Sequence, residues 1–394
     1  MDRQIPELVP YGRQLISVAD EHAVLACLRS DFLTQGPAVS AFERGLCQVS
    51  GAGHAVAFNS ATSALHAACL ALGLGVGDRL WTSPISFVAS ANCALYCGAE
   101  VDFVDIDRST GLLSMPALVA KLEEAERRGT LPKVVVPVHL AGTSCPMVDL
   151  ASLARRYGFA LLEDASHAVG GYYQRRPVGC GAYSAITVFS FHPVKIVTTG
   201  EGGAALTNDP ALAARLKRLC SHGIERESFE LDSPGPWYYE QQELGFNYRL
   251  TDLQASLGLS QLQSLEAFVD RRHTLMARYR KAMADWPVAF LEVPEDCRSS
   301  YHLAVLRLPN ATPVQHRSVF EALRARRIGV QLHYWPIHLQ PYYRRLGFQH
   351  GAYPEAEAYA TSCLSLPLFP ALAEAEQDRV LRALGESLQE QRLL

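Results

Sequence analysis

Short apolar runs alternate with helical patterns between residues 55 and 208. The apolar runs are rich in Val, Ile and Leu and lack polar alternation, and they predict strands at 55–58, 79–82, 100–106, 133–140, 159–163, 185–191 and 203–208. Helical patterns separate them at 60–72, 87–97 and 147–157. Such strands are buried on both faces, and the helices between them make the crossovers of a mostly parallel sheet. The pattern therefore predicts an α/β domain with helices on both faces of the sheet.

The second part of the chain has a different pattern. A helix at 211–223 and a Pro- and Tyr-rich loop at 230–242 lead to a long helical stretch at 251–286, with Thr251 as its N-cap. Strand-like runs at 301–308 and 329–334, a helix at 313–327 and a closing helix follow. This order predicts a smaller C-terminal α+β domain. We expect a large α/β domain at 1–255 and the small domain at 256–394.

Composition narrows the class of protein. The chain has 394 residues, of which 48% are hydrophobic and 19% charged, with a net charge of −4, so neither disorder nor a dedicated nucleic-acid binder is expected. Its ten cysteines include no C-x-x-C pair, which favours reduced thiols. Residues 1–14 lack the apolar region of a signal peptide, and the uncharged stretch at 61–77 is too short to span a membrane. A soluble cytoplasmic enzyme without nucleic-acid or membrane partners is expected.

Small hydroxylated residues open the first helix after a strand, in the segment FNSATSAL (58–65). Free backbone N–H groups and the positive end of the helix dipole suit a phosphate there, with Thr62 and Ser63 as contacts. An ordinary N-cap explains the segment equally well.

The segment LLEDASHA (161–168) ends a buried strand with Asp164 and places His167 one short turn later. A carboxylate in such a position must be paired, hydrated or bound to something positive. By itself, an aspartate that caps a helix is the simpler interpretation.

A lysine follows another apolar strand in VFSFHPVKIVTTGEGGA (188–204). Desolvation disfavours the charge of Lys195 in such surroundings, and a lysine with a lowered pKa is a nucleophile for aldehydes. Ser190 could donate a hydroxyl to an anion. Further along, Asn247 and Arg249 precede a helix, where capping is the favoured interpretation from spacing alone. Together, a phosphate site, a carboxylate and a lysine are the parts that hold pyridoxal 5′-phosphate.

At these residues the sequence resembles the DegT/DnrJ/EryC1/StrS family of sugar aminotransferases, which have the type I fold of pyridoxal-phosphate enzymes. The resemblance covers nearly the whole chain. The segments that carry it, in family order, are LTQGPAVSAFE (33–43), FNSATSAL, PISFVASAN (84–92), LLEDASHA, SFHPVKIVTTGEGG (190–203), GFNYRLTDLQASLGLSQL (245–262) and VQLHYWPIH (330–338).

The resemblance implies a catalytic role for Lys195, Asp164 and His167. Lys195 would form a Schiff base with pyridoxal 5′-phosphate, Asp164 would pair with the pyridinium nitrogen, and His167 would lie beside the ring and its 3-hydroxyl. The other cofactor contacts that it implies are Thr62, Ser63 and Ser190 at the phosphate, Phe87 on the ring face, and Asn247 from the neighbouring subunit of a homodimer.

The implied substrate contacts are Thr34, His333, Tyr334 and His338. Histidines at this spacing could also hold a metal, but a metal has no part in this chemistry and none is expected. Without the family, Phe87 would be read as a core aromatic of an amphipathic helix.

The tripeptide ASH and the segments SFHPVK and HYWPIH resemble one branch of the family. That resemblance implies transfer of an amino group from L-glutamate to C4 of a UDP-4-keto-6-deoxy-N-acetylhexosamine. The product would be UDP-4-amino-4,6-dideoxy-N-acetyl-β-L-altrosamine, in pseudaminic acid biosynthesis. An aminotransferase for a different nucleotide-linked keto sugar is an alternative. Another is a non-catalytic nucleotide-sugar-binding protein, which would be expected to lose Lys195 or Asp164. Dehydratases of the family replace the lysine with histidine, and Lys195 argues against that activity.

Overall fold

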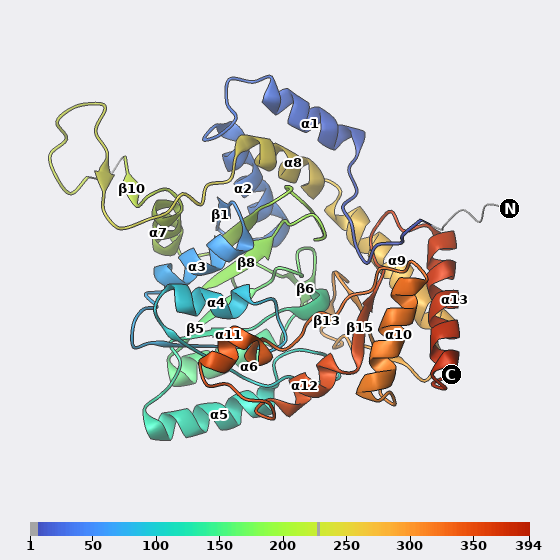
Figure 1. The fold of residues 1–394 in the computed structure, drawn as a ribbon. Coiled ribbons are helices and arrows are strands. Elements are labelled where there is room, and N and C mark those ends of the chain that lie inside the picture. The colour runs from blue at the N-terminus through green and yellow to red at the C-terminus, as the bar shows by residue number, and fades with distance from the viewer. Residues whose placement is uncertain (1–6, 227–228) are drawn as a thin grey trace.

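The structure is a computed structural model that describes residues 7–226 and 229–394 (Figure 1). The expectation that residues 1–14 are no signal peptide falls partly on residues 1–6, which lie outside the described residues.

A seven-stranded sheet forms the centre of the first part of the chain (Figure 1). In spatial order its strands are β1 (His54–Phe58), β9 (Gly203–Thr207), β8 (Ile186–Ser190), β5 (Ala160–Asp164), β4 (Val134–Val136), β2 (Arg79–Thr82) and β3 (Glu100–Phe103). The five strands from β8 to β3 are parallel to one another, whereas β9 is antiparallel to both β1 and β8. The predicted mostly parallel sheet is confirmed.

Helices cover both faces of this sheet, as predicted. One face carries α3 (Ala61–Ala71), α4 (Ala89–Tyr96) and α7 (Pro210–Cys220). The other face carries α2 (Pro37–Ser50), α5 (Met115–Arg128), α6 (Met147–Tyr157) and α8 (Asp252–Leu262). Successive strand residues alternate between these layers: Val134 and Val136 join the core on the α3 side, and Val135 joins the core on the α5 side. Burial on both faces explains why the strands lack polar alternation.

The C-terminal part contains a three-stranded antiparallel sheet and its own core. The sheet consists of β12 (Ala289–Phe290), β14 (Ala304–Arg307) and β15 (Cys363–Leu366). Apolar side chains from this sheet pack with those of α9 (Leu265–Ala282), α10 (Pro313–Ala325) and α13 (Glu374–Glu390). The predicted α+β character is confirmed, while the boundary between residues 255 and 256 stays a prediction.

The predicted helical stretch at 251–286 is two helices. α8 ends at Leu262 and α9 begins at Leu265, with Ser264 as its N-cap. α8 packs on the core of the large sheet together with the start of α9, through Leu265, Phe268 and Val269. Further along α9, Leu275, Met276 and Tyr279 pack on the core of the three-stranded sheet, so α9 passes from one core to the other.

The strand predicted at 329–334 is wrong. Only Gln331 forms a β-bridge there, with Ser365 next to it in space. Residues 331–335 follow the wall of one cavity in irregular backbone, and Leu332 and Trp335 also line a second cavity beside residues 313–324.

Shorter elements connect these layers. They are α1 (Val18–Leu28), η1 (Leu140–Gly142), β6 (Tyr172–Tyr173), β7 (Arg176–Pro177), β10 (Ile224–Glu225), β11 (Glu240–Gln241), β13 (Cys297–Arg298), η2 (Ile337–Leu339), α11 (Pro341–Arg345) and α12 (Pro354–Ala360). All ten cysteines are free. Within residues 7–226 and 229–394, no helix is both long and apolar enough to cross a membrane.

Candidate active site

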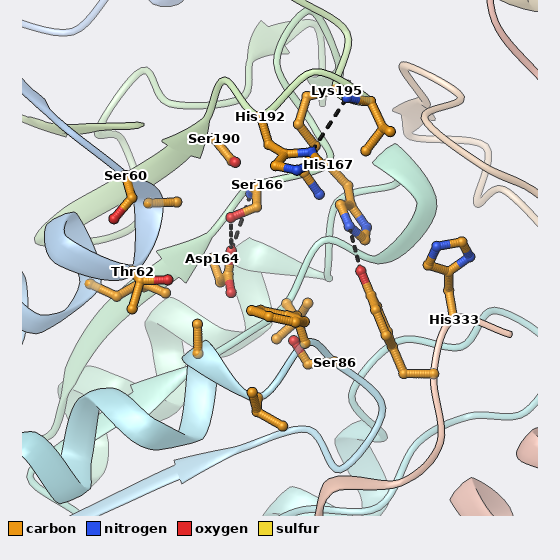
Figure 2. Close-up of a pocket in the computed structure, with 18 of the residues that line it drawn as sticks. Ser60, Thr62, Ser86, Asp164, Ser166, His167, Ser190, His192, Lys195 and His333 are labelled. Atoms are coloured by element: carbon orange, nitrogen blue, oxygen red, sulfur yellow. Dashed lines mark hydrogen bonds between the residues drawn. The ribbon is translucent and has the colours of Figure 1, made fainter. Parts of the chain in front are cut away.

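A cavity of about 1110 Å³ lies at the carboxyl ends of the parallel strands β5 and β8. Open α/β sheets place their ligands at this edge. Its walls come from the start of α3, the ends of the two strands, the turn at 192–195 and the C-terminal segment 331–335. Figure 2 shows Asp164 near the centre, with Ser60 and Thr62 on one side and His333 on the other.

The start of α3 forms an anion site on one wall. Ser60 caps the helix, because its Oγ accepts a hydrogen bond from the Ser63 backbone N–H at 3.1 Å. The first-turn N–H groups before Ser63 have no acceptor inside the helix, and they lie at its positive end. Gly203 has no side chain, which lets the start of α3 lie directly against β9. A Cβ at this position would lie 2.4 Å from the Ala61 nitrogen. Ser190, which pairs with Gly203 in the sheet, lines the same side of the cavity.

Asp164 is the last residue of β5 and is 5% exposed. Its Oδ2 accepts a hydrogen bond from Ser90 Oγ at 2.5 Å. Its Oδ1 accepts from Ser166 Oγ at 2.6 Å and from the Ser166 N–H at 3.1 Å (Figure 2). These donors hold both carboxylate oxygens in place. The cavity therefore contains a fixed negative charge that suits a cationic nitrogen.

Lys195 follows β8 in a turn closed by its backbone N–H, which donates to the His192 carbonyl at 2.9 Å. Its side chain lines the cavity. Burial lowers the pKa of Lys195 to about 8, against the opposing charge of Asp164. Among the described residues no side chain forms a hydrogen bond with the amine, so it is free to react with a bound group.

His167 connects the sheet side of the cavity to the C-terminal side. Its Nδ1 accepts a hydrogen bond from the Ala141 N–H at 3.3 Å, and its Nε2 lies 3.1 Å from Tyr334 Oη. The ring of His302 packs against it, with 4.4 Å between centroids. Burial and the charge of Lys195 hold the pKa of His167 well below its ordinary value. The imidazole is therefore neutral.

The structure brings most of the predicted site residues to this cavity. Those that line it are Thr62, Ser63, Phe87, Asp164, His167, Ser190, Lys195, His333 and Tyr334. Phe87 is 58% exposed and faces Tyr334 across a centroid distance of 6.4 Å. It is therefore no core residue.

Three predicted residues do not line the cavity. Thr34 is exposed and forms a β-bridge with Thr251. Asn247 is also exposed, outside the cavity of its own chain. His338 is fully buried beneath the surface, where its Nε2 contacts Glu357 Oε1 at 2.9 Å. The substrate contact predicted for His338 stays a prediction, and a direct contact would require the ring to leave Glu357.

Several lining residues carried no sequence pattern that pointed to the site. Tyr11 lies in an irregular N-terminal segment, and His302 lies just before β14. His302 is 3% exposed, and its Nδ1 has no hydrogen-bond partner. Ser166 and His192 belong to segments already singled out, so their positions next to Asp164 and Lys195 could have marked them. Nothing in the sequence could have marked Tyr11 or His302.

The residues present fit pyridoxal 5′-phosphate. The helix start suits its phosphate, the Asp164 carboxylate suits a protonated ring nitrogen, and the free amine of Lys195 suits its aldehyde. The histidines of the cavity do not change this chemistry, because the described residues include no group of three or more His, Cys, Asp or Glu placed to hold a metal ion.

Comparisons with known proteins agree with this fit. The model of the DegT/DnrJ/EryC1/StrS aminotransferase family matches residues 15–385. The chain is 38% identical over 383 residues, 96% of each protein, to the spore coat polysaccharide biosynthesis protein SpsC of Bacillus subtilis.

Solved structures show the same similarity. The chain matches Helicobacter pylori PseC, an aminotransferase involved in the biosynthesis of pseudoaminic acid, at a TM-score of 0.90 and 31% identity, over 98% of this chain and 100% of that one. It also matches the PLP form of the putative sugar aminotransferase Spr1654 from Streptococcus pneumoniae at a TM-score of 0.89 and 28% identity, over 98% and 99% of the two chains.

Proposed function

The chain belongs to the DegT/DnrJ/EryC1/StrS aminotransferase family, and from that premise we propose the roles of its cavity residues and the sugar on which it acts. It is a sugar aminotransferase that depends on pyridoxal 5′-phosphate. The observation that carries the proposal is that one cavity joins the Asp164 carboxylate to the free amine of Lys195 beside the start of α3.

When bound, pyridoxal 5′-phosphate carries the amino group between donor and acceptor and withdraws electrons from the carbon that loses a proton. Asp164 would hold a proton on the ring nitrogen, because two serine donors fix the position of its carboxylate at the end of β5. Phe87 and His167 line the same cavity, and they would lie against one face of the ring and beside it, respectively.

Lys195 moves the proton. A general base works best when its pKa is near the operating pH, and burial brings the pKa of Lys195 to about 8. The neutral amine takes a proton from the α-carbon of the amino donor, which we propose to be L-glutamate. The protonated amine then returns a proton to the sugar carbon, and the side from which it approaches sets the configuration of the product.

The phosphate would bind at the start of α3, beside its free backbone N–H groups and the hydroxyls of Thr62 and Ser190. Ser63 lines the same wall, and its hydroxyl, which donates to Asn59 Oδ1 at 2.7 Å in the structure, would have to turn toward the phosphate to contribute. We propose that Asn247 completes this site in a neighbouring subunit of a homodimer. Its exposed position outside its own cavity supports this role.

The proposed acceptor is the C4 ketone of a UDP-4-keto-6-deoxy-N-acetylhexosamine, aminated to UDP-4-amino-4,6-dideoxy-N-acetyl-β-L-altrosamine for pseudaminic acid biosynthesis. Similarity to Helicobacter pylori PseC over the whole chain supports this choice. His333 and Tyr334 line the cavity and are the proposed sugar contacts. His333 lies on the side opposite Ser60 and Thr62 (Figure 2). Thr34 does not line the cavity of its own chain and is proposed as a further sugar contact.

A second acceptor deserves a direct test. The 38% identity to SpsC of Bacillus subtilis, a spore coat polysaccharide biosynthesis protein, supports another nucleotide-linked keto sugar as the second candidate.

Two measurements test the proposal. Borohydride reduction of the purified protein followed by peptide mapping is expected to find the pyridoxyl label on Lys195 alone. Incubation with glutamate and a panel of nucleotide-linked keto sugars, followed by mass spectrometry, is expected to show conversion of the UDP-4-keto sugar. A label on another residue would contradict the role of Lys195, and conversion of only a different sugar would establish the second candidate.

A further inference from the structure

A backbone amide decides which nitrogen of His167 carries the proton. The Ala141 N–H donates to His167 Nδ1 at 3.3 Å. A nitrogen that accepts a hydrogen bond carries no proton, so the neutral ring has its proton on Nε2. The direction of the next hydrogen bond follows from this.

Tyr334 Oη lies 3.1 Å from His167 Nε2. Because Nε2 carries the proton, the histidine donates and the tyrosine oxygen accepts. The proton of the Tyr334 hydroxyl is therefore free, and among the described residues no other group accepts it. Burial, followed by the charge of Asp164, raises the pKa of Tyr334 well above its ordinary value, so the hydroxyl keeps that proton.

The turn that presents the Ala141 amide is fixed on both sides. Ala141 has a left-handed φ of 58°, and Gly142 has a φ of 99°. A Cβ on Gly142 would lie 2.4 Å from Ser300 Oγ, which itself donates to the His167 carbonyl at 2.8 Å. The Ser300 N–H donates to the Gly142 carbonyl at 3.0 Å. Through these contacts, Ser300 fixes the position of His167 relative to the turn.

A second histidine of the same sheet edge has the same arrangement. The Cys145 N–H donates to His139 Nδ1 at 3.2 Å, and His139 Nε2 donates to Glu163 Oε2 at 2.7 Å. There the acceptor is a carboxylate, which has no proton to pass on, and the chain of hydrogen bonds ends in the core. At His167 the acceptor is a phenol that lines the cavity, so the chain continues to whatever is bound there.

We propose that the Ala141 amide and His167 fix the hydrogen-bond polarity of Tyr334, so that Tyr334 donates its phenolic proton to an oxygen of the molecule bound in the cavity. His167 is then a positioning residue and Tyr334 the group that touches the ligand. The assignment of that oxygen to the cofactor or to the sugar rests on the proposed function, whereas the hydrogen-bond direction does not.

The hydrogen-bond direction can be measured without any reaction. Nitrogen NMR of the full-length protein with labelled histidine, before and after removal of the cofactor, reports which ring nitrogen carries a proton, and the His167→Gln variant assigns the signal. We expect a neutral His167 with its proton on Nε2. A proton on Nδ1, or on both nitrogens at neutral pH, would overturn the proposal even if the enzyme transfers amino groups.

Removal of the phenolic hydroxyl identifies the acceptor. In Tyr334→Phe, a shift of about one unit in the pH midpoint of the visible cofactor absorbance places the acceptor oxygen on the cofactor. An unchanged midpoint with KM for the sugar raised about tenfold places it on the substrate. If both the midpoint and KM keep their values in a folded variant, Tyr334 donates to neither and the proposal fails.

A matched pair of substitutions tests the role of His167. The amide of His167→Gln can accept from Ala141 and donate to Tyr334, whereas the carboxylate of His167→Glu can only accept, which draws the phenolic proton away from the cavity. We expect the Glu variant to show the changes of Tyr334→Phe, and the Gln variant to rescue them.

The added charge of the Glu variant needs its own control. In the Tyr334→Phe background the Gln and Glu variants should give the same midpoint and the same KM, because the hydroxyl that transmits the difference is gone. If the Gln and Glu variants still differ by the full amount in midpoint or KM in this background, the added charge acts directly on the bound molecule and not through Tyr334. That result would overturn the proposal.

Discussion

The two halves of the cavity are built in different ways. On the sheet side, Asp164 and Ser190 are the last residues of β5 and β8, and their backbones are fixed by hydrogen bonds to neighbouring strands. On the C-terminal side, His302 and the segment 331–335 lie in irregular backbone, with the Gln331 bridge as the β-pairing of that segment.

This difference separates chemistry from recognition. Groups that act on the reacting atoms need fixed positions, and strand ends in a sheet supply them. Irregular segments on a rigid scaffold tolerate changes of sequence and shape, which suits the part that selects a substrate. We therefore expect sheet-side substitutions to change turnover and the cofactor spectrum, and C-terminal substitutions to change KM.

The largest effect is expected for Lys195→Ala. Loss of the free amine should abolish both turnover and the visible absorbance of the bound cofactor, because no second amine of the described residues lines the cavity. Absorbance spectra and assays with glutamate check this outcome.

Lys121→Ala is a matched control for that variant. Lys121 is also largely buried, but its Nζ donates to the Phe103 carbonyl at 2.6 Å and pairs with Asp102 at 2.6 Å. This variant should lose about 1–3 kcal/mol of unfolding free energy and keep the absorbance. Normal turnover in Lys195→Ala would contradict the assignment of the chemistry to the sheet side of the cavity.

Asp164→Asn comes next in expected size. The amide keeps the shape and can still accept from Ser166, but it removes the negative charge at the end of β5. Turnover should fall about 100-fold, the scale on which one preorganised electrostatic partner acts, with KM for the sugar changed little. Steady-state kinetics on cofactor-saturated protein measure both. A change confined to KM would place Asp164 among the recognition residues.

The pH dependence of cofactor capture should follow Lys195. Only the neutral amine attacks an aldehyde, so the rate at which cofactor-free protein gains visible absorbance should rise with pH through about 8 and then level off. Below the midpoint the rate should fall about tenfold per pH unit. The charge of Asp164 raises the pKa of Lys195, so Asp164→Asn should move the midpoint to lower pH. A midpoint that stays in place would mean that the two groups do not interact.

The same division explains what the sequence could predict. Asp164 and Lys195 could be found because each follows a buried strand, and parallel strand ends meet at one edge of a sheet. His302 could not be found, since no local pattern says that the residues before β14 pack against His167.

The two wrong elements have related causes. The break between α8 and α9 lasts only residues 263–264, too short to disturb a helical pattern. The segment 329–334 has the composition of a strand, but its polar side chains line a cavity that only the tertiary fold creates.

The smallest expected effect concerns the border of the C-terminal half. His338 and His333 are both buried, at 0% and 7% exposure, yet only His333 lines the cavity. In His338→Gln the new amide can still donate to Glu357, but the contact with the Tyr353 ring at 4.7 Å is lost. This should cost about 1–2 kcal/mol of unfolding free energy without changing KM for the sugar, whereas His333→Gln should raise KM severalfold.

Urea unfolding measures the loss of stability in each of the two variants, and sugar titrations measure KM. An equal rise of KM in both variants would mean that substrate binding depends on residues beneath the cavity wall, as far as Glu357. Buried residues of the irregular segment would then contribute to recognition as much as those that line the cavity.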